Sequence, residues 1–180
     1  GLRSSCQLCN LSIAVARAGD TIASLTRKVK AAAIFGTIQS TATNFPGLRP
    51  VWKKNCDEER LLGVDINGQL DCPLFAGVDD ADIASVYSMM RERAIIQNRD
   101  TAAALGINAS TAVTCVKPSG NSSTLLDCSP GLHPRHAAYY IRNVRVSSHS
   151  PVYKVLRDAG APLSPENGQT AETATTWVCS

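Results

Sequence analysis

Strand-like and helix-like runs alternate along the chain, and this alternation limits its fold more than any other feature. Residues 8–15 form an apolar run with two polar breaks, which predicts a loop that leads into a buried strand. A helix is expected next, with Asp20 as its N-cap and apolar residues at steps of three and four. These apolar residues are Ile22, Leu25, Val29 and Ala33. Such an amphipathic helix packs one face against a sheet.

The same pattern continues through the rest of the chain. The elements expected next are a short polar helix at about 51–60, a strand at 61–66, a turn at 67–68, a longer helix capped by Asp79 and Asp80 that ends near Gly106, and a strand at 111–116. A long loop at 117–134, a strand at 139–146, a helix that begins at Ser150 and Pro151 and closes at Gly160, and a strand at 174–179 complete the series. Strands and helices at this spacing predict a mostly parallel α/β sheet or part of an α/β barrel.

Length and composition indicate one folded domain without a nucleic-acid arm. The chain has 180 residues, of which 44% are hydrophobic and 18% charged, as in ordinary globular proteins. Its formal net charge of +3 is spread along the sequence without a block of like charges. The chain opens at Gly1 and stops at Ser180 directly after a strand-like run, so residues 1–180 are expected to be part of a single domain, truncated at both ends.

Seven cysteines, with neither a signal peptide nor an apolar run of membrane-spanning length, predict a reducing cytoplasmic location with free thiols. Cys6 and Cys9 form a Cys-x-x-Cys pair, which can be a redox dithiol, half of a zinc site, or two thiols that act as small apolar residues. The other five cysteines are scattered singly, so no metal site is expected. A stand-alone thiol oxidoreductase or a zinc-binding module remains an alternative.

The loop after residue 116 has the composition of a phosphate-binding loop. Proline and glycine fix a tight backbone, while hydroxyls, peptide N–H groups and a lysine supply what a phosphate needs at the carboxyl end of a strand. The candidate substrate-binding residues are Pro118, Ser119, Gly120, Asn121 and Ser122. The Walker A order is absent, which removes the usual nucleoside-triphosphatase prediction, and an ordinary surface turn has the same composition.

Two further polar clusters receive no catalytic role. The first can line a polar site or contact an anion, and it consists of His133, Arg135, His136, Tyr139, Tyr140, Arg142 and Arg145. Alternating arginines on a strand, such as Arg142 and Arg145, more often belong to its solvated face. Residues 57–60 are interpreted as a solvated helix end, because no complementary acid or base lies near them in the sequence.

Taken together, several segments resemble the large subunit of ribonucleotide reductase, and their residues are most similar to those of the class II, adenosylcobalamin-dependent enzymes. The segments that carry the resemblance are Cys9-Asn10-Leu11-Ser12, residues 36–45, Asn55-Cys56-Asp57-Glu58-Glu59-Arg60-Leu61-Leu62-Gly63-Val64, the turn Asn67-Gly68, Val116-Lys117-Pro118-Ser119-Gly120 and Tyr140-Ile141-Arg142-Asn143-Val144-Arg145. They occur in order over nearly the whole chain.

The resemblance implies part of a ten-stranded α/β barrel in which a thiyl radical abstracts the 3′ hydrogen of a ribonucleotide and a cysteine pair then reduces the 2′ position. Cys9 matches one member of this redox pair, and its partner and the radical cysteine belong to segments upstream of this chain. Residues 118–122 match the loop that holds the substrate phosphates, although Asn121 replaces the usual threonine. Cys6 is unusual beside the redox cysteine and is hypothesised to compete in thiol exchange.

The resemblance also implies a cofactor and partners. They are adenosylcobalamin in the intact enzyme, a ribonucleoside di- or triphosphate, a thioredoxin-like reductant and the remainder of the same polypeptide, with neither nucleic acid nor membrane. The chain alone is expected to be inactive. A class I, diiron-dependent reductase large subunit, which shares the barrel, remains a second alternative.

Overall fold

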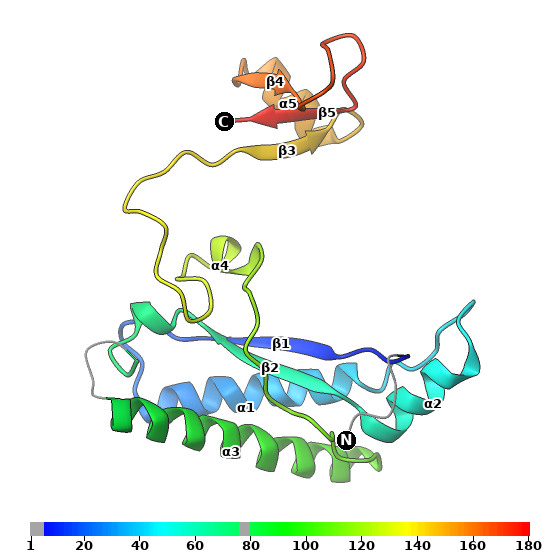
Figure 1. The fold of residues 1–180 in the computed structure, drawn as a ribbon, viewed down its shortest axis with the longest axis vertical. Helices are drawn as coiled ribbons and strands as arrows, with labels where there is room; N and C mark the ends of the chain where they lie inside the picture. The colour runs from blue at the N-terminus through cyan, green and yellow to red at the C-terminus, as the bar shows by residue number, and fades with distance from the viewer. Residues whose placement is uncertain (1–5, 76–79) are drawn as a thin grey trace. The chain divides into compact units, whose positions relative to one another are not determined.

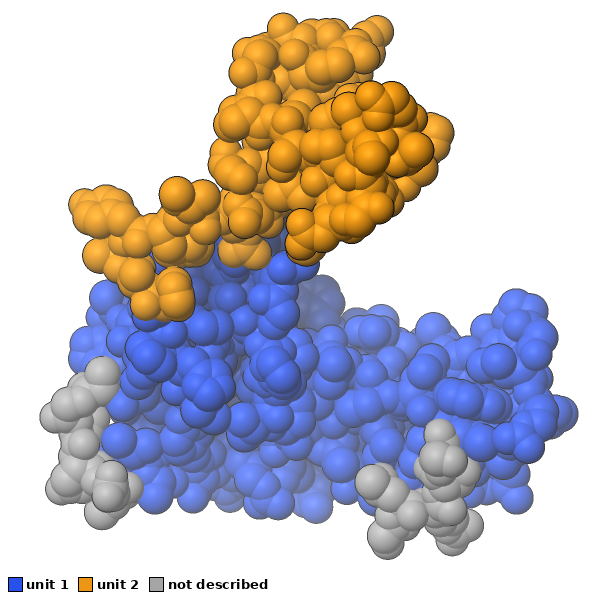
Figure 2. Space-filling view, turned by 45° about the horizontal axis from the view of Figure 1, so that its top comes forward, with its two compact units in different colours: residues 1–135 blue, residues 136–180 orange. Residues whose placement is uncertain are grey.

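A computed structural model describes residues 6–75 and 80–180 of the chain. The chain divides into two compact units, residues 1–135 and 136–180, which Figure 2 shows in different colours. Within the described ranges, no helix is both long and apolar enough to cross a membrane.

The first unit is built on parallel strands covered by helices. Its elements are β1 (Asn10–Val15), α1 (Ile22–Gln39), α2 (Pro50–Glu59), β2 (Leu62–Asn67), the short 3-10 turn η1 (Gln69–Asp71), α3 (Asp80–Leu105) and the single turn α4 (Ser122–Leu125). Strands β1 and β2 pair in parallel, with Asn10 beside Leu62 and Val15 beside Asn67. Figure 1 shows α1 and α3 together on one side of this pair. The parallel α/β arrangement predicted from the sequence is therefore present here.

The strand predicted at 111–116 forms only one isolated bridge, between Thr114 and Val64 of β2. The segment still runs parallel to β2 on the side away from β1, where the amide of Cys115 donates to the carbonyl of Val64 at 3.1 Å. The amides of Leu62 and Val64 reach the carbonyls of two adjacent residues, Ala112 and Val113. A regular ladder advances two residues at each step on both strands, so this mismatch interrupts the third strand.

The core of this unit lies between the strands and the helices. Ala14, Val64 and Ile66 point to the helix layer, where they meet apolar residues of α1 and α3 such as Leu25 and Met90. Contact between α1 and β2 is close at Gly36, since a Cβ there would lie 3.1 Å from Leu62 Cδ2. Even a methyl group at position 36 would therefore require the neighbouring side chains to shift.

The N-cap of α1 is Thr21, and the prediction of Asp20 was wrong by one residue. Thr21 and Ser24 form a reciprocal capping box, in which each side chain accepts from the other residue's backbone N–H. Asp20 supports this cap from outside, because its carboxylate accepts from Ser24 Oγ at 2.6 Å and pairs with Lys28. The predicted cap Asp79 lies outside the described residues, and α3 itself ends at Leu105 as expected.

The second unit is a small antiparallel sheet with one helix. It contains β3 (Val144–Ser147), α5 (Pro151–Asp158), β4 (Leu163–Pro165) and β5 (Thr176–Cys179), in the sheet order β3-β5-β4. The predicted helix start is confirmed, because Ser150 Oγ accepts from the amide of Val152 at 3.3 Å. Gly160 follows the helix end with a φ of +71°, a left-handed conformation that suits glycine.

Three expectations fail in the second unit. The sheet is antiparallel, so the mostly parallel prediction applies to the first unit alone. The strand predicted at 139–146 begins only at Val144, and Tyr139 and Ile141 before it are 94% and 83% exposed, without the burial that a paired strand provides. Strand β4 was missed because it is three residues long and contains a proline, which is tolerated at an edge.

Candidate functional site

The parallel strands present a second face, away from the helices. Side chains alternate along a strand, so alternate residues of the two strands share this face. They are Leu11, Ile13 and Val15 of β1, which pair in register with Gly63, Asp65 and Asn67 of β2. We call it the loop face, because α4 and the loop around it lie on this side of the strands in Figure 1. The predicted site residues must be placed relative to this face.

Cys9 immediately precedes β1, at the end of the loop face where the strands begin. Its sulfur lies 3.4 Å from the position that a Cβ on Gly63 would occupy, and the sulfur of Cys115 lies 2.9 Å from the same point. Thiols from the segments on either side of β2 therefore both lie over Gly63. Desolvation raises the pKa of the Cys9 thiol above its ordinary value, so Cys9 is protonated at neutral pH.

Cys6, the other member of the Cys-x-x-Cys pair, has different surroundings. The guanidinium of Arg49 donates to its sulfur at 3.2 Å, and the Asn55 amide donates to its carbonyl at 3.1 Å. None of the seven cysteines, which all lie in the described part of the chain, forms a disulfide. Across residues 6–75 and 80–180, no three His, Cys, Asp or Glu side chains are grouped closely enough to hold a metal ion.

The predicted phosphate loop lies at the other end of the loop face. The side-chain amide of Asn67, the last residue of β2, donates to Ser122 Oγ at 3.2 Å, and its oxygen accepts from the Gly131 amide at 3.1 Å. Gly120 has a φ of +57°, which a glycine adopts without strain. Ser119 is buried and its hydroxyl lies 2.7 Å from that of Ser123.

The remaining predicted loop residues are open to solvent. Pro118, Gly120 and Asn121 are exposed, and Ser122 is half-buried. The loop is therefore held from below by Ser119 and Ser122, while its tip faces outward. Asn67 is fully buried and fastens both arms of the loop. Sequence reasoning treated Asn67 only as a turn residue, because its burial and its partners become visible only in the folded chain.

Ion pairs hold the far arm of the loop. Asp71 accepts from the Ser129 amide at 2.6 Å and from Arg135 at 3.1 Å, and Arg135 also pairs with Asp127 at 2.8 Å. Arg17 donates to the carbonyls of Leu126 and Asp127. Arg135 is thus occupied in fastening the loop.

Asp65 lies midway along the loop face. It is 3% exposed, and its Oδ2 finds no hydrogen-bond partner in the described part of the chain. Burial raises the pKa of this carboxyl, and backbone N–H groups and the positive charge of Lys117 only partly oppose the shift. The position is therefore a place where a proton is held more tightly than on an ordinary carboxylate.

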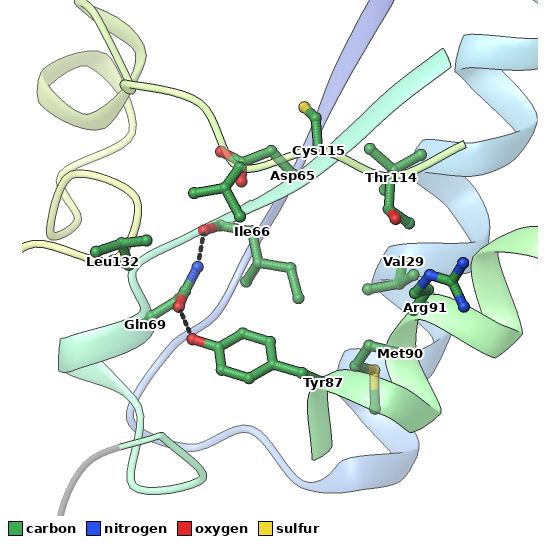
Figure 3. Close-up of a pocket in the computed structure, with 12 residues that line it drawn as sticks. Val29, Asp65, Ile66, Gln69, Tyr87, Met90, Arg91, Thr114, Cys115 and Leu132 are labelled. Carbon is green, nitrogen blue, oxygen red and sulfur yellow. Dashed lines mark hydrogen bonds between the residues drawn. The ribbon is translucent and has the colours of Figure 1, made fainter. Parts of the chain in front are cut away.

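A cavity of about 520 Å³ opens beside Asp65 (Figure 3). Its walls come mainly from β2, α3 and the 114–116 segment, which includes Cys115. Across it, the hydroxyl of Tyr87 donates to Gln69 Oε1, and Gln69 in turn donates to the carbonyl of Ile66 at 2.7 Å. Neither Cys9 nor residues 118–122 line this cavity.

No family model matches the chain, but several known proteins are similar to it. The adenosylcobalamin-dependent ribonucleoside-triphosphate reductase of Lactobacillus helveticus is 37% identical over 62 residues, 34% of this chain and 8% of that protein. The enzymes of the same name from Euglena gracilis and Lactobacillus delbrueckii subsp. bulgaricus are 38% identical over 61 residues and 33% over 83. These two matches cover 34% and 46% of the chain, and 8% and 11% of the relatives.

A solved structure of a B12-dependent, class II ribonucleotide reductase matches 98% of this chain and 27% of its own, with a TM-score of 0.68 and 18% identity. The chain matches a segment of class II ribonucleotide reductases. The family resemblance and the fold class expected from the sequence are confirmed. The matches span only about a tenth of the length of these curated relatives.

The class II reductase fold explains the loop face. In an α/β barrel the helices form the outer layer, so the opposite face of the strands points inward. Cys9 and residues 118–122 both belong to this inward face, at its two ends. Gly63 and Asn67 mark those ends and are four residues apart on β2, which corresponds to roughly 13 Å. The sequence had placed a thiol and an anion-binding loop in one site, and the structure puts them on one face of the reductase-like segment.

Asp65 gives this segment a pH-dependent stability. A carboxyl whose pKa is raised by folding stabilises the protein fully below its unfolded pKa, and this contribution is lost as the pH rises through the folded pKa. We expect Asp65→Asn to remove that loss. The free energy of unfolding of the variant should therefore increase relative to that of the parent chain as the pH rises from about 4 toward neutrality. Urea unfolding between pH 4 and 8 measures this, and parallel pH profiles for both proteins would contradict it.

Proposed function

We propose that this chain is a segment of an adenosylcobalamin-dependent ribonucleoside-triphosphate reductase, in which Cys9 delivers reducing equivalents and residues 118–122 hold the triphosphate. The observation that carries the proposal is that both lie on one inward sheet face, at the two ends of β2. Gly63 and Asn67, the β2 residues beside which they lie, are roughly 13 Å apart along the strand, which is on the scale of a nucleotide. The names of the relatives favour a triphosphate over a diphosphate.

The chemistry at Cys9 is a two-electron reduction. Two thiols become one disulfide, while the sugar C2′–OH becomes C2′–H and leaves its oxygen as water, so atoms and electrons balance. Cys9 supplies one thiol, and the second comes from an upstream cysteine of the complete polypeptide. A thioredoxin-like dithiol then regenerates both thiols by exchange. Cys9 suits this role because its side chain is exposed and its raised pKa keeps the proton that the departing hydroxyl needs.

The loop supplies binding energy away from the reacting carbon. Its exposed tip at Pro118, Gly120 and Asn121 presents backbone and side-chain groups, while Ser119 and Ser122 are tied down beneath. Lys117 adds a positive charge at the entrance. A rigid cradle for the polyphosphate fixes the sugar over the thiol, and such remote binding energy is what positions a substrate for reaction.

Adenosylcobalamin does not fit the cavity beside Asp65. A volume of about 520 Å³ suits a drug-sized ligand, whereas a corrinoid with its nucleotide tail is far larger. The cofactor of the proposed enzyme, which supplies radical chemistry, is therefore bound outside this cavity, in the intact protein. The residues of this chain contribute a thiol and a phosphate cradle. The free thiols of such an enzyme need a reducing compartment, so a cytoplasmic location is part of the proposal.

Deoxyribonucleotide formation by the complete reductase polypeptide tests the proposal. We expect turnover with a ribonucleoside triphosphate, a dithiol and adenosylcobalamin, and none when the cobalamin is left out. The 180-residue chain alone should be inactive under the same conditions. Turnover that needs a diiron subunit instead of cobalamin would favour a class I reductase, and thiol exchange by the isolated chain through Cys6 and Cys9 would favour a stand-alone oxidoreductase.

A further inference from the structure

Cys115 is a second thiol beside Cys9 that the proposed reduction does not use. The two residues belong to segments on either side of β2, and both of their sulfurs lie close to the point above Gly63 that a side chain would occupy. A Cβ at position 63 would lie 2.9 Å from the sulfur of Cys115 and 3.4 Å from that of Cys9. This pairing could not be predicted from the sequence, because the two cysteines are far apart in the chain.

A disulfide between these two cysteines is excluded by the strand that separates them. Neighbouring strands lie about 4.8 Å apart, so two residues with a strand between them have Cα atoms about 9.6 Å apart. A disulfide needs a Cα separation below about 7 Å. Cys115 therefore stays a thiol while Cys9 passes between thiol and disulfide, and it does not trap Cys9 in a dead-end bond.

The charges around Cys115 favour its protonated form. Burial raises the pKa of the Cys115 thiol, and Asp65 and Cys9 raise it further, while Lys117 acts in the opposite direction. Tyr87 and Arg91 of α3 line the same cavity as Cys115 and Asp65. The Cys115 thiol therefore holds its proton more tightly than an ordinary cysteine does.

We propose that Cys115 is a positioning residue for Cys9, whose thiol donates a hydrogen bond to the Cys9 sulfur across Gly63 when Cys9 becomes a thiolate. This rests on the proposed function, in which Cys9 must become a thiolate each time its disulfide is opened by the external dithiol. An S–H donor next to a thiolate stabilises the charge in a site that is partly closed to water. Gly63 is the structural requirement, since any side chain there separates the two sulfurs.

The pH dependence of Cys9 alkylation in the full chain tests this contact. Iodoacetamide reacts with the thiolate, so the midpoint of the rate profile, followed by mass mapping of Cys9, reports its pKa. We expect Cys115→Ala to move this midpoint upward on the order of one pH unit, and Cys115→Ser to restore part of the shift through its hydroxyl. Cys179→Ala is the matched control, because Cys179 is equally half-buried but lies in the other unit, and it should leave the midpoint unchanged.

Gly63→Ala tests the geometry with both thiols retained. Its new methyl group would meet only side chains, those of Leu11, Cys115 and Cys9, so the strand can keep its course while the sulfurs move apart. We expect the same upward shift of the midpoint as in Cys115→Ala, with an unchanged circular dichroism spectrum. An unchanged or lowered midpoint in Cys115→Ala, or in Gly63→Ala if the first variant fails to fold, would overturn the inference.

The two proposals fail in different experiments. If the alkylation midpoint shifts but the complete polypeptide makes no deoxyribonucleotide, the contact between the two thiols stands and the reductase assignment is wrong. Cobalamin-dependent turnover together with an unshifted midpoint would retain the reductase and remove the role of Cys115.

Discussion

Replacing Cys9 by serine in the complete reductase should lower multiple-turnover formation of deoxyribonucleotide by about three orders of magnitude or more, because a serine cannot form the disulfide that stores the two electrons. Groups that act as a unit lose most of the activity when one is removed. Nucleotide binding should persist, since Cys9 lies at the opposite end of β2 from the phosphate loop. Steady-state turnover and equilibrium binding of a ribonucleoside triphosphate measure the two effects separately.

Cys6→Ser is the matched control for this prediction. Cys6 lies three residues earlier, but its sulfur accepts from Arg49 and its carbonyl from Asn55, both on the α2 side of the molecule. We expect its turnover to stay within a factor of about two of the parent enzyme, in the range of ordinary surface substitutions. Equal losses for Cys6→Ser and Cys9→Ser would instead indicate that the Cys-x-x-Cys pair acts as one dithiol.

The sequence predicted the parts of the fold that local patterns determine. The helix periodicity around Leu25 and Val29 and the apolar run of β2 identified the two layers of the first unit. The cap of α1 was misplaced by one residue because Asp20 and Thr21 both have capping side chains, and only the geometry shows which of them accepts from the helix. The second unit was misjudged because strand direction depends on pairing between residues distant in sequence.

The candidate site shows the same division. Cys9 and residues 118–122 were recognisable from local sequence and from the family resemblance, and they stay predictions until turnover is measured. Three residues were missed because each acts through a residue that comes close only on folding. Asn67 bonds Ser122 and Gly131, and Cys115 lies near Asp65 and Cys9. A single sequence carries no signal for such contacts.

Asn67→Ala should destabilise the first unit by about 3 kcal/mol and raise the KM for the nucleotide on the order of tenfold. The substitution removes the hydrogen bond to Ser122 and leaves the buried Gly131 amide without its acceptor, and such an orphaned group costs more than the bond itself contributed. Both arms of the phosphate loop then lose their common anchor. A tenfold rise in KM corresponds to a loss of about 1.4 kcal/mol in the binding free energy of the nucleotide. Urea unfolding, hydrogen exchange at the Gly131 amide and steady-state kinetics measure these effects.

Asn98→Ala separates the loss of stability from the loss of loop order. Asn98 is another almost fully buried asparagine, and it bonds Thr37 and Ser110 at 2.9 Å, on the helix side of the sheet and away from the loop. Its removal should cost a similar free energy of unfolding, because it too leaves buried polar groups unpaired. The KM and the Gly131 exchange rate should remain those of the parent. If both variants raised KM equally, the effect of Asn67 would be one of general stability, and the loop would have no dedicated anchor at the end of β2.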